Sequence, residues 1–197
     1  MWAFLTSLLF ALIAAGNSIK CHKCSNRNGT TCSGELVECD PNVTSCQNFI
    51  FEAQIETQKI GMAFKGCKDN TFKSYYLSKT ATPTAFERAM QVRCRYEGCN
   101  SGNIEFKPKD LTKNGVQCPA CYNITSLECA KKELLDCTGD ETNCIHYEGL
   151  VSFDGVNPFP LVLYGCVNWV KCTPFAPFTG GLIQHTYYSK CKEGIKV

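Results

Sequence analysis

The sequence predicts a small, disulfide-rich, all-β protein built from two repeated units. Sixteen of its 197 residues are cysteine, a content typical of disulfide scaffolds. The cysteines fall into two sets of eight with nearly equal spacings, and short runs of alternating apolar residues lie between clusters of Gly, Pro, Asn and Thr. The formal net charge of +2 is too small to favour nucleic acid or anionic lipid as a general partner.

The first residues predict the compartment. Residues 2–15 are apolar apart from Thr6 and Ser7, and Gly16 and Ser18 follow them. This pattern is typical of a secretory signal peptide over residues 1–18, and the alternative is a buried N-terminal helix. The apolar run is shorter than the roughly 20 residues that span a bilayer. Since residues 189–197 are polar, no anchor is expected there either, and the sequence predicts a secreted, extracellular protein.

The cysteine pattern predicts a duplication. The first set is Cys21, Cys24, Cys32, Cys39, Cys46, Cys67, Cys94 and Cys99, and the second is Cys118, Cys121, Cys129, Cys137, Cys144, Cys166, Cys172 and Cys191. Subtracting the first six numbers of each set gives offsets of 97, 97, 97, 98, 98 and 99. We therefore expect a first domain over residues 19–100, a linker over 101–117 and a second domain over 118–197.

Each unit is small enough to need covalent support. Domains of this size bury too little apolar surface to exceed the entropy of the chain by much. Four disulfides in each unit, at about 2–4 kcal/mol each, would supply the missing stability. We therefore interpret the cysteines as structural.

The alternating segments predict strands separated by turns. We expect strands at residues 47–55, 60–67, 144–153, 160–167 and 181–191. Residues 86–92 and 126–135 have some helical character, and we expect a strand at the first and a loop at the second.

Catalytic and metal chemistry are not supported by the motifs. The pairs Cys21/Cys24 and Cys118/Cys121 have the spacing of zinc or redox cysteines, but a zinc site needs its second pair about 15–20 residues further on. The three histidines, His22, His146 and His185, share no motif with a serine nucleophile, and we expect His146 and His185 to be solvated. The sequence therefore predicts neither an enzyme nor a cofactor or metal site.

Three N-x-[ST] triplets agree with an extracellular location. They begin at Asn28, Asn42 and Asn123, and each is a candidate N-glycosylation site.

The order of cysteines resembles a known family. Cys-x2-Cys-x7-Cys-x6-Cys-x6-Cys followed by Gly66-Cys67, with the ending CRYEGCN at residues 94–100, is similar to the Ly6/uPAR three-finger domain. The resemblance extends to the second unit, where the first six cysteines recur at nearly the same spacing. Eight cysteines alone allow 105 pairings. The resemblance implies these bonds: Cys21–Cys46, Cys24–Cys32, Cys39–Cys67, Cys94–Cys99, Cys118–Cys144, Cys121–Cys129, Cys137–Cys166 and Cys172–Cys191.

Both units depart from the family pattern of ten cysteines. In the first unit, Thr71 and Arg93 stand where the fourth family pair would lie. In the second, the chain ends before a terminal Cys-x4-Cys-Asn. Each departure removes a whole bond, so we expect no free thiol, and the last strand of the second unit must be held without its usual clamp.

The resemblance implies a non-enzymatic binding function. Two-unit secreted members include sodefrin precursor-like courtship pheromones and gamma-type phospholipase A2 inhibitors. The leader and the entry KCHKC at residues 20–24 look more like the pheromone group. This favours a signal that acts on an extracellular receptor. The alternatives are a protein that binds and blocks secreted phospholipase A2, and an adhesion or receptor-binding protein with neither role.

Loops are the expected contact regions, because a rigid scaffold can hold variable loops. The candidates are residues 25–31, 68–85, 152–160 and 173–181. The last two carry aromatic rings on proline-stiffened segments, and the predicted partner-binding residues are Phe153, Phe159, Phe175 and Phe178. We expect Phe175 and Phe178 to be at least partly exposed. The alternative is that these rings pack between the two units.

Overall fold

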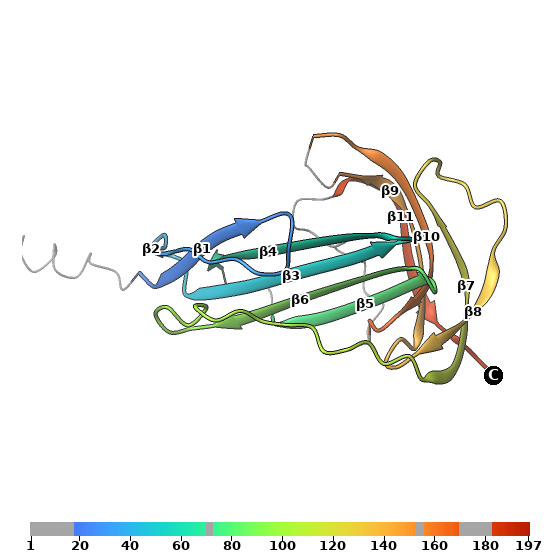
Figure 1. The fold of residues 1–197 in the computed structure, drawn as a ribbon, viewed down its shortest axis with the longest axis horizontal. Helices are drawn as coiled ribbons and strands as arrows, with labels where there is room; N and C mark the ends of the chain where they lie inside the picture. The colour runs from blue at the N-terminus through green and yellow to red at the C-terminus, as the bar shows by residue number, and fades with distance from the viewer. Residues whose placement is uncertain (1–17, 70–72, 153–155, 170–182) are drawn as a thin grey trace, which may run out of the picture. The chain divides into compact units, whose positions relative to one another are not determined.

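The structure, a computed structural model, consists of β-strands joined by turns (Figure 1). It describes residues 18–69, 73–152, 156–169 and 183–197, and no helix occurs within these ranges. The strands are β1 (Lys20–Asn26), β2 (Glu35–Glu38), β3 (Ser45–Ile55), β4 (Gln58–Lys68), β5 (Tyr75–Thr82), β6 (Ala85–Cys94), β7 (Lys113–Asn123), β8 (Glu133–Thr138), β9 (Asn143–Val151), β10 (Phe159–Val167), β11 (Ile183–Glu193) and β12 (Ile195–Lys196). The predicted all-β class is confirmed.

The chain forms two compact units whose borders cut across the long strands. One unit comprises Met1–Ile50, Gly61–Tyr75 and Met90–Glu105. The other comprises Phe51–Ile60, Tyr76–Ala89 and Phe106–Val197. The far halves of β3 to β6 therefore belong to the same compact unit as the second cysteine set.

In the first unit, β1 pairs with two other strands, β2 and β4. It pairs antiparallel with β2, where Cys21 lies opposite Val37, and with β4, where Cys24 lies opposite Lys65. The core here is a cluster of half-cystines, and the Sγ atoms of Cys21 and Cys39 are 3.3 Å apart. A domain this small buries little aliphatic surface, and disulfide sulfurs occupy the centre of this unit instead.

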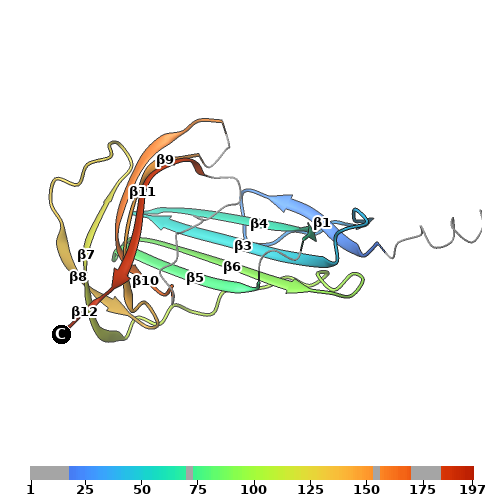
Figure 2. The same ribbon diagram turned by 180° about the vertical axis from the view of Figure 1, so that it is seen from behind.

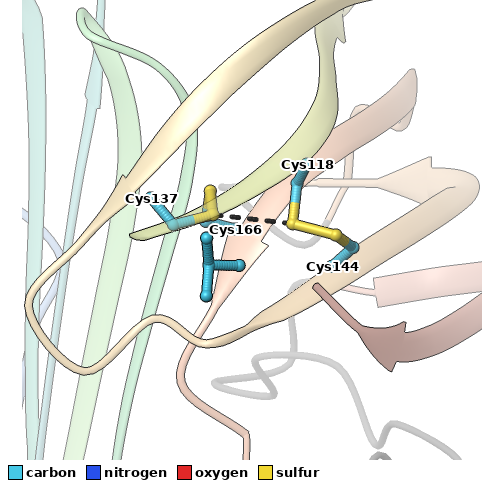
Figure 3. Packing of buried hydrophobic residues seen from close by; sticks show 5 residues of the cluster. Cys118, Cys137, Cys144 and Cys166 are labelled. Carbon is cyan, nitrogen blue, oxygen red and sulfur yellow. Dashed lines mark hydrogen bonds between the residues drawn. A yellow bond between two sulfur atoms is a disulfide. The ribbon is translucent and has the colours of Figure 1, made fainter. Parts of the chain in front are cut away.

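The second unit repeats this arrangement. Figure 3 shows the Cys118–Cys144 bond beside Cys137 and Cys166, and the Sγ atoms of Cys118 and Cys137 are 3.5 Å apart. Val116 packs in the same cluster. The equivalent pairs of the two sets thus touch at nearly the same distance, as expected of a duplicated unit.

Seven disulfides join the described cysteines. They are Cys21–Cys46, Cys24–Cys32, Cys39–Cys67, Cys94–Cys99, Cys118–Cys144, Cys121–Cys129 and Cys137–Cys166. They connect the same cysteines that the family resemblance implies. Cys172 lies outside the described residues, so the pair Cys172–Cys191 stays a prediction. Within the described ranges no cysteine is a free thiol.

The sheet of the second unit is built around β10. This strand pairs along its whole length with β9, which in turn pairs with β11 (Figure 2). On its other side, β10 pairs with β7 through its middle residues Val162–Tyr164 and with β5 near its C-terminal end, where Cys166 lies opposite Thr80. In the order β11–β9–β10 the three strands are neighbours, so side chains on the same side of them form one surface.

A buried polar cluster holds β5 in this unit. The carboxylate of Glu141, which is 1% exposed, accepts hydrogen bonds from Ser78 Oγ at 2.5 Å and Thr80 Oγ1 at 2.9 Å. The Lys109 ammonium lies 3.2 Å from the same carboxylate and compensates its charge. A second buried ion pair joins Lys79 and Glu87 at 3.0 Å. Burial lowers the pKa of Lys79, and Glu87 acts in the opposite direction.

The chain end of the second unit is held by main-chain pairing. β12 pairs with β7, with Ile195 opposite Gln117, and the Val197 amide donates to the Gly115 carbonyl at 3.0 Å. The Gly194 amide donates to the Thr142 carbonyl. These hydrogen bonds fix the last strand where the family pattern has a disulfide clamp.

Several expectations about individual segments need correction. Residues 68–85 were expected to be a contact loop, but 75–82 form β5, and Leu77 and Ala81 are buried. β8 begins at Glu133, so the loop expected at 126–135 is shorter. β7 begins at Lys113, within the expected linker. The strand expected at residues 86–92 is confirmed, since it lies within β6.

An aromatic and basic face as the candidate functional site

Strand register brings five side chains into neighbouring positions on β9, β10 and β11. His146 of β9 lies opposite Tyr164 of β10 and also opposite Lys190 of β11. Two positions further along β9, Glu148 lies opposite Tyr188. Alternate residues of a strand share a face, so these side chains lie on one side of the sheet.

The rings of this row are in contact. The centroids of His146 and Tyr164 are 3.9 Å apart with an interplanar angle of 18°, a stacked pair. On its other side His146 meets Tyr188 at 4.3 Å and 44°. The Lys132 ammonium lies 3.9 Å from the Tyr164 centroid, so Lys132 and His146 occupy opposite faces of that ring. The four groups form one continuous stack, called the aromatic row below.

A carboxylate fixes the imidazole at the centre. Nε2 of His146 lies 2.6 Å from Oε1 of Glu148, and both side chains are half-buried. Together with the ring contacts to Tyr164 and Tyr188, this contact leaves the imidazole little rotational freedom. The aromatic row is therefore pre-organised for contact.

A shallow groove adjoins the aromatic row. It has a volume of about 210 Å³ and is lined by Pro119, Cys144, Ile145, His146, Tyr164, Tyr188, Lys190 and Lys192. Tyr188 is 40% exposed, and both lysines are exposed. The groove thus combines apolar ring surface with two cationic groups.

The opposite face of β9 explains why the row faces outward. Ile145 and Tyr147 alternate with His146 and Glu148, and both are buried. Burial raises the pKa of Tyr147, so its hydroxyl stays neutral. The apolar alternation fixes the register of β9, and the polar members of the same run are left on the outside.

The predicted partner-binding phenylalanines are only partly described. Phe153, Phe175 and Phe178 lie outside the described residues. Phe159 was expected on a contact loop, but it is half-buried in β10, opposite Val151. Its neighbour Pro160 belongs to the same strand and lies opposite Leu150.

The expectation for one histidine was wrong. His146 was expected to be a solvated strand residue, but it is half-buried, stacks on Tyr164 and makes a tilted ring contact with Tyr188. His185 is exposed and makes an edge contact with Tyr187. Nδ1 of His22 lies 2.9 Å from the Gly34 carbonyl. Sequence reasoning missed the aromatic row because its members come from three strands, and only the alternation of residues 144–151 indicated an outward face.

The glycosylation candidates differ in their surroundings. Asn28 and Asn42 are exposed. Asn123 is half-buried, and its Nδ2 donates to Ser126 Oγ and to the Glu128 carbonyl, both at 2.9 Å.

Two groups of three sulfurs have the proximity of metal ligands. They are Cys21, Cys39 and Cys67 in the first unit and Cys118, Cys137 and Cys166 in the second. All six cysteines belong to disulfides, and metal ions bind thiolates rather than bridged sulfurs. Their proximity results from the disulfide clusters at the centres of the two units.

The fold and the site define a class of protein: a disulfide-rich, all-β scaffold with aromatic and basic side chains on an outward face. The chain belongs to the u-PAR/Ly-6 family: the model of the u-PAR/Ly-6 domain matches residues 17–102 and 114–194. The resemblance seen in the sequence and the two tandem three-finger domains are thereby confirmed. Among the described residues, the structure contains no helix long and apolar enough to cross a bilayer.

Three curated relatives match most of the chain. Phospholipase A2 inhibitor NAI of Notechis ater is 26% identical over 180 residues, which cover 86% of each chain. Phospholipase A2 inhibitor PIP of Malayopython reticulatus is 24% identical over 165 residues, covering 82% of this chain and 79% of the relative. Ly6/PLAUR domain-containing protein 8 of Bos taurus is 26% identical over 163 residues, covering 79% and 67%.

One solved structure is also similar. The crystal structure of mouse TEX101 covers 90% of this chain and 99% of its own, with a TM-score of 0.40 and 15% sequence identity.

Proposed function

We propose that this protein is a secreted, non-enzymatic binding protein whose partner is another extracellular protein. Membership of the u-PAR/Ly-6 family supports this, together with the outward-facing aromatic row on the second unit. Tyrosine and histidine rings held on a rigid sheet lose little entropy when a partner covers them. The signal peptide at residues 1–18 and the glycosylation of Asn28, Asn42 and Asn123 are parts of the same proposal.

We propose a secreted phospholipase A2 as the partner. The observation that carries this is the relationship to phospholipase A2 inhibitors over both repeats, with 86% of this chain and 86% of the relative aligned in one case. The sequence alone favoured a pheromone-like signal. The similarity to curated phospholipase A2 inhibitors is the reason that we propose the inhibitor function first. The protein would act by covering the surface through which the lipase reaches lipid.

The direct test is inhibition. Purified full-length protein is titrated into a secreted phospholipase A2 that hydrolyses phospholipid vesicles, and the initial rate is measured. Saturable inhibition near equimolar protein supports the proposal. The matched control is the same protein reduced and alkylated, which loses the knots and should not inhibit. Unchanged rates at micromolar protein would reject a phospholipase partner.

A second candidate function is supported by a specific sequence feature. The leader and the entry KCHKC at residues 20–24 resemble sodefrin precursor-like pheromones. In that case the protein binds a chemosensory receptor and does not inhibit the lipase. Transcript abundance separates the two functions, since courtship gland or skin favours the signal and liver favours the inhibitor.

A further inference from the structure

We infer that the groove beside the aromatic row binds an acidic segment of the partner protein, in which a carboxylate side chain lies next to an apolar or aromatic one. This inference rests on the proposed binding function and names the chemistry that the partner must offer. It concerns six of the residues that line the groove: Pro119, His146, Tyr164, Tyr188, Lys190 and Lys192.

Charge is the first reason. Lys190 and Lys192 are alternate residues of β11 and therefore project to the same face, and both side chains are exposed. No carboxylate among the described residues forms an ion pair with either ammonium group. No acidic residue lines the groove among the part of the chain that the structure describes. The two cations are therefore available to a partner.

The carboxylate of the aromatic row's neighbour Glu148 is already engaged. Glu148 is 2.6 Å from Nε2 of His146, and this contact directs it to the imidazole. Lys132, which contributes a third cationic group to the row, lies against the ring of Tyr164. The net local charge is therefore positive, although residues 113–197 contain 7 Lys and Arg against 8 Asp and Glu. Such a local excess selects an acidic partner and raises its rate of association.

Apolar surface is the second reason. The rings of Tyr188 and Tyr164 line the groove together with Pro119. These rings are held by stacking, so a bound aromatic or aliphatic side chain would lie on a fixed surface. Sulfated glycans and phosphates would use the lysines but leave this apolar surface uncovered. A protein segment that alternates acidic and apolar residues uses both.

The test uses a defined peptide and the full-length protein. The probe is the fluorescein-labelled peptide Phe-Glu-Phe-Glu with a C-terminal amide, and its matched control is Phe-Gln-Phe-Gln. Fluorescence polarisation gives both dissociation constants. We expect the glutamate peptide to bind at least about fivefold more tightly, because only its two carboxylates can form exposed charge pairs with the lysines. The preference should decrease at high salt.

Two charge-matched variants locate the effect. K190Q/K192Q should abolish the preference for the glutamate peptide. K23Q/K59Q removes two exposed lysines elsewhere and should preserve it. Tyr188→Ser should weaken the binding of both peptides by a similar factor. Thermal unfolding of each variant establishes that the fold is retained.

Four results would overturn the inference. They are equal binding of the two peptides, equal loss in both lysine variants, no binding of either peptide at millimolar concentration, and binding of a heparin oligosaccharide without binding of the peptide. Inhibition assays with K190Q/K192Q separate this inference from the proposed function. If K190Q/K192Q still inhibits fully, the groove does not bind the partner, but the proposed inhibitor function stands. If the unmodified protein binds the peptide without inhibiting the lipase, binding at the groove stands and the inhibitor function is rejected.

Discussion

The side-chain amide of Asn100 bonds both main-chain polar groups of His22. Its Oδ1 accepts from the His22 amide at 2.9 Å, and its Nδ2 donates to the His22 carbonyl at 2.8 Å. Nδ2 also donates to the Gln47 carbonyl at 3.1 Å, and the residue is 1% exposed. Asn100 therefore ties β1 and β3 to the segment closed by the Cys94–Cys99 bond. This explains why asparagine follows the last cysteine of the first unit.

Replacing Asn100 by alanine should destabilise the first unit strongly. Three main-chain groups lose a buried partner, and we expect the free energy of unfolding to fall by about 2–4 kcal/mol. Denaturant unfolding measures the change. Asn103 is exposed, and Asn103→Ala should change stability by less than about 0.5 kcal/mol. Equal effects in the two variants would contradict the role of Asn100.

The repeated Gly-Cys pairs should tolerate alanine differently. A Cβ at Gly165 would lie 2.0 Å from the Thr80 carbonyl oxygen and 2.8 Å from Ala81 Cα, both main-chain atoms. A Cβ at Gly66 would meet only the ring of Phe64, at 3.1 Å, and that ring is 36% exposed and can move. We expect Gly165→Ala to cost about 3 kcal/mol and Gly66→Ala less than about 1 kcal/mol. A milder effect at Gly165, measured by thermal unfolding, would contradict the close approach of β10 to β5.

Removing one partner of the buried Lys79–Glu87 pair should be costly. Glu87→Gln keeps the shape but leaves the Lys79 ammonium buried without its 3.0 Å counter-charge. We expect a loss of about 3–5 kcal/mol at neutral pH. The double variant K79M/E87L removes both charges and should lose less than Glu87→Gln alone.

The deficit of Glu87→Gln should shrink as pH rises. Burial lowers the pKa of Lys79 below its ordinary value of 10.5, and Glu87 raises it, so the substitution lowers it further. Between the lowered pKa and 10.5 the unfolded chain binds the proton more tightly, so raising the pH stabilises the folded variant. Unfolding curves at pH 7 and pH 9.5 test this relation. A deficit that grows with pH would show that Lys79 does not carry the effect.

Glycan occupancy should differ among the three triplets. The amide nitrogens of Asn28 and Asn42 are on exposed residues. A glycosylated nitrogen keeps a single N–H, so a sugar on Asn123 would remove one of its two hydrogen bonds. We expect high occupancy at Asn28 and Asn42 and lower occupancy at Asn123 in protein secreted from animal cells. Mass spectrometry of glycopeptides measures it, and the highest occupancy at Asn123 would contradict the prediction.

The cysteine spacing was sufficient to predict the repeat and the class of fold. The repeat can be read from the cysteine offsets of 97 to 99 and from the segment between Cys94 and Asn100. This works because each disulfide cluster joins cysteines of a single repeat. The clustering of the far halves of β3 to β6 with the second unit had no such local signal. It depends on pairing of β5 with β10, which are distant in the sequence.

The candidate site was less predictable than the fold. Whether His146 stacks on Tyr164 and Tyr188 depends on the register of three strands, and β11 contains two irregularities between Ile183 and Tyr188. A shift of one residue would turn its side chains to the other face. Sequence periodicity indicates which residues of a strand share a face but not which residue lies opposite on the neighbouring strand.

The most direct test of partner binding through the second unit is amide hydrogen exchange on the full-length protein, alone and with excess secreted phospholipase A2. Binding through the aromatic row should slow exchange in residues 143–151 and 183–193, which form β9 and β11. Exchange in residues 20–38, which hold β1 and β2, should be unchanged. Slower exchange confined to residues 20–38, or no change anywhere in the chain, would contradict it.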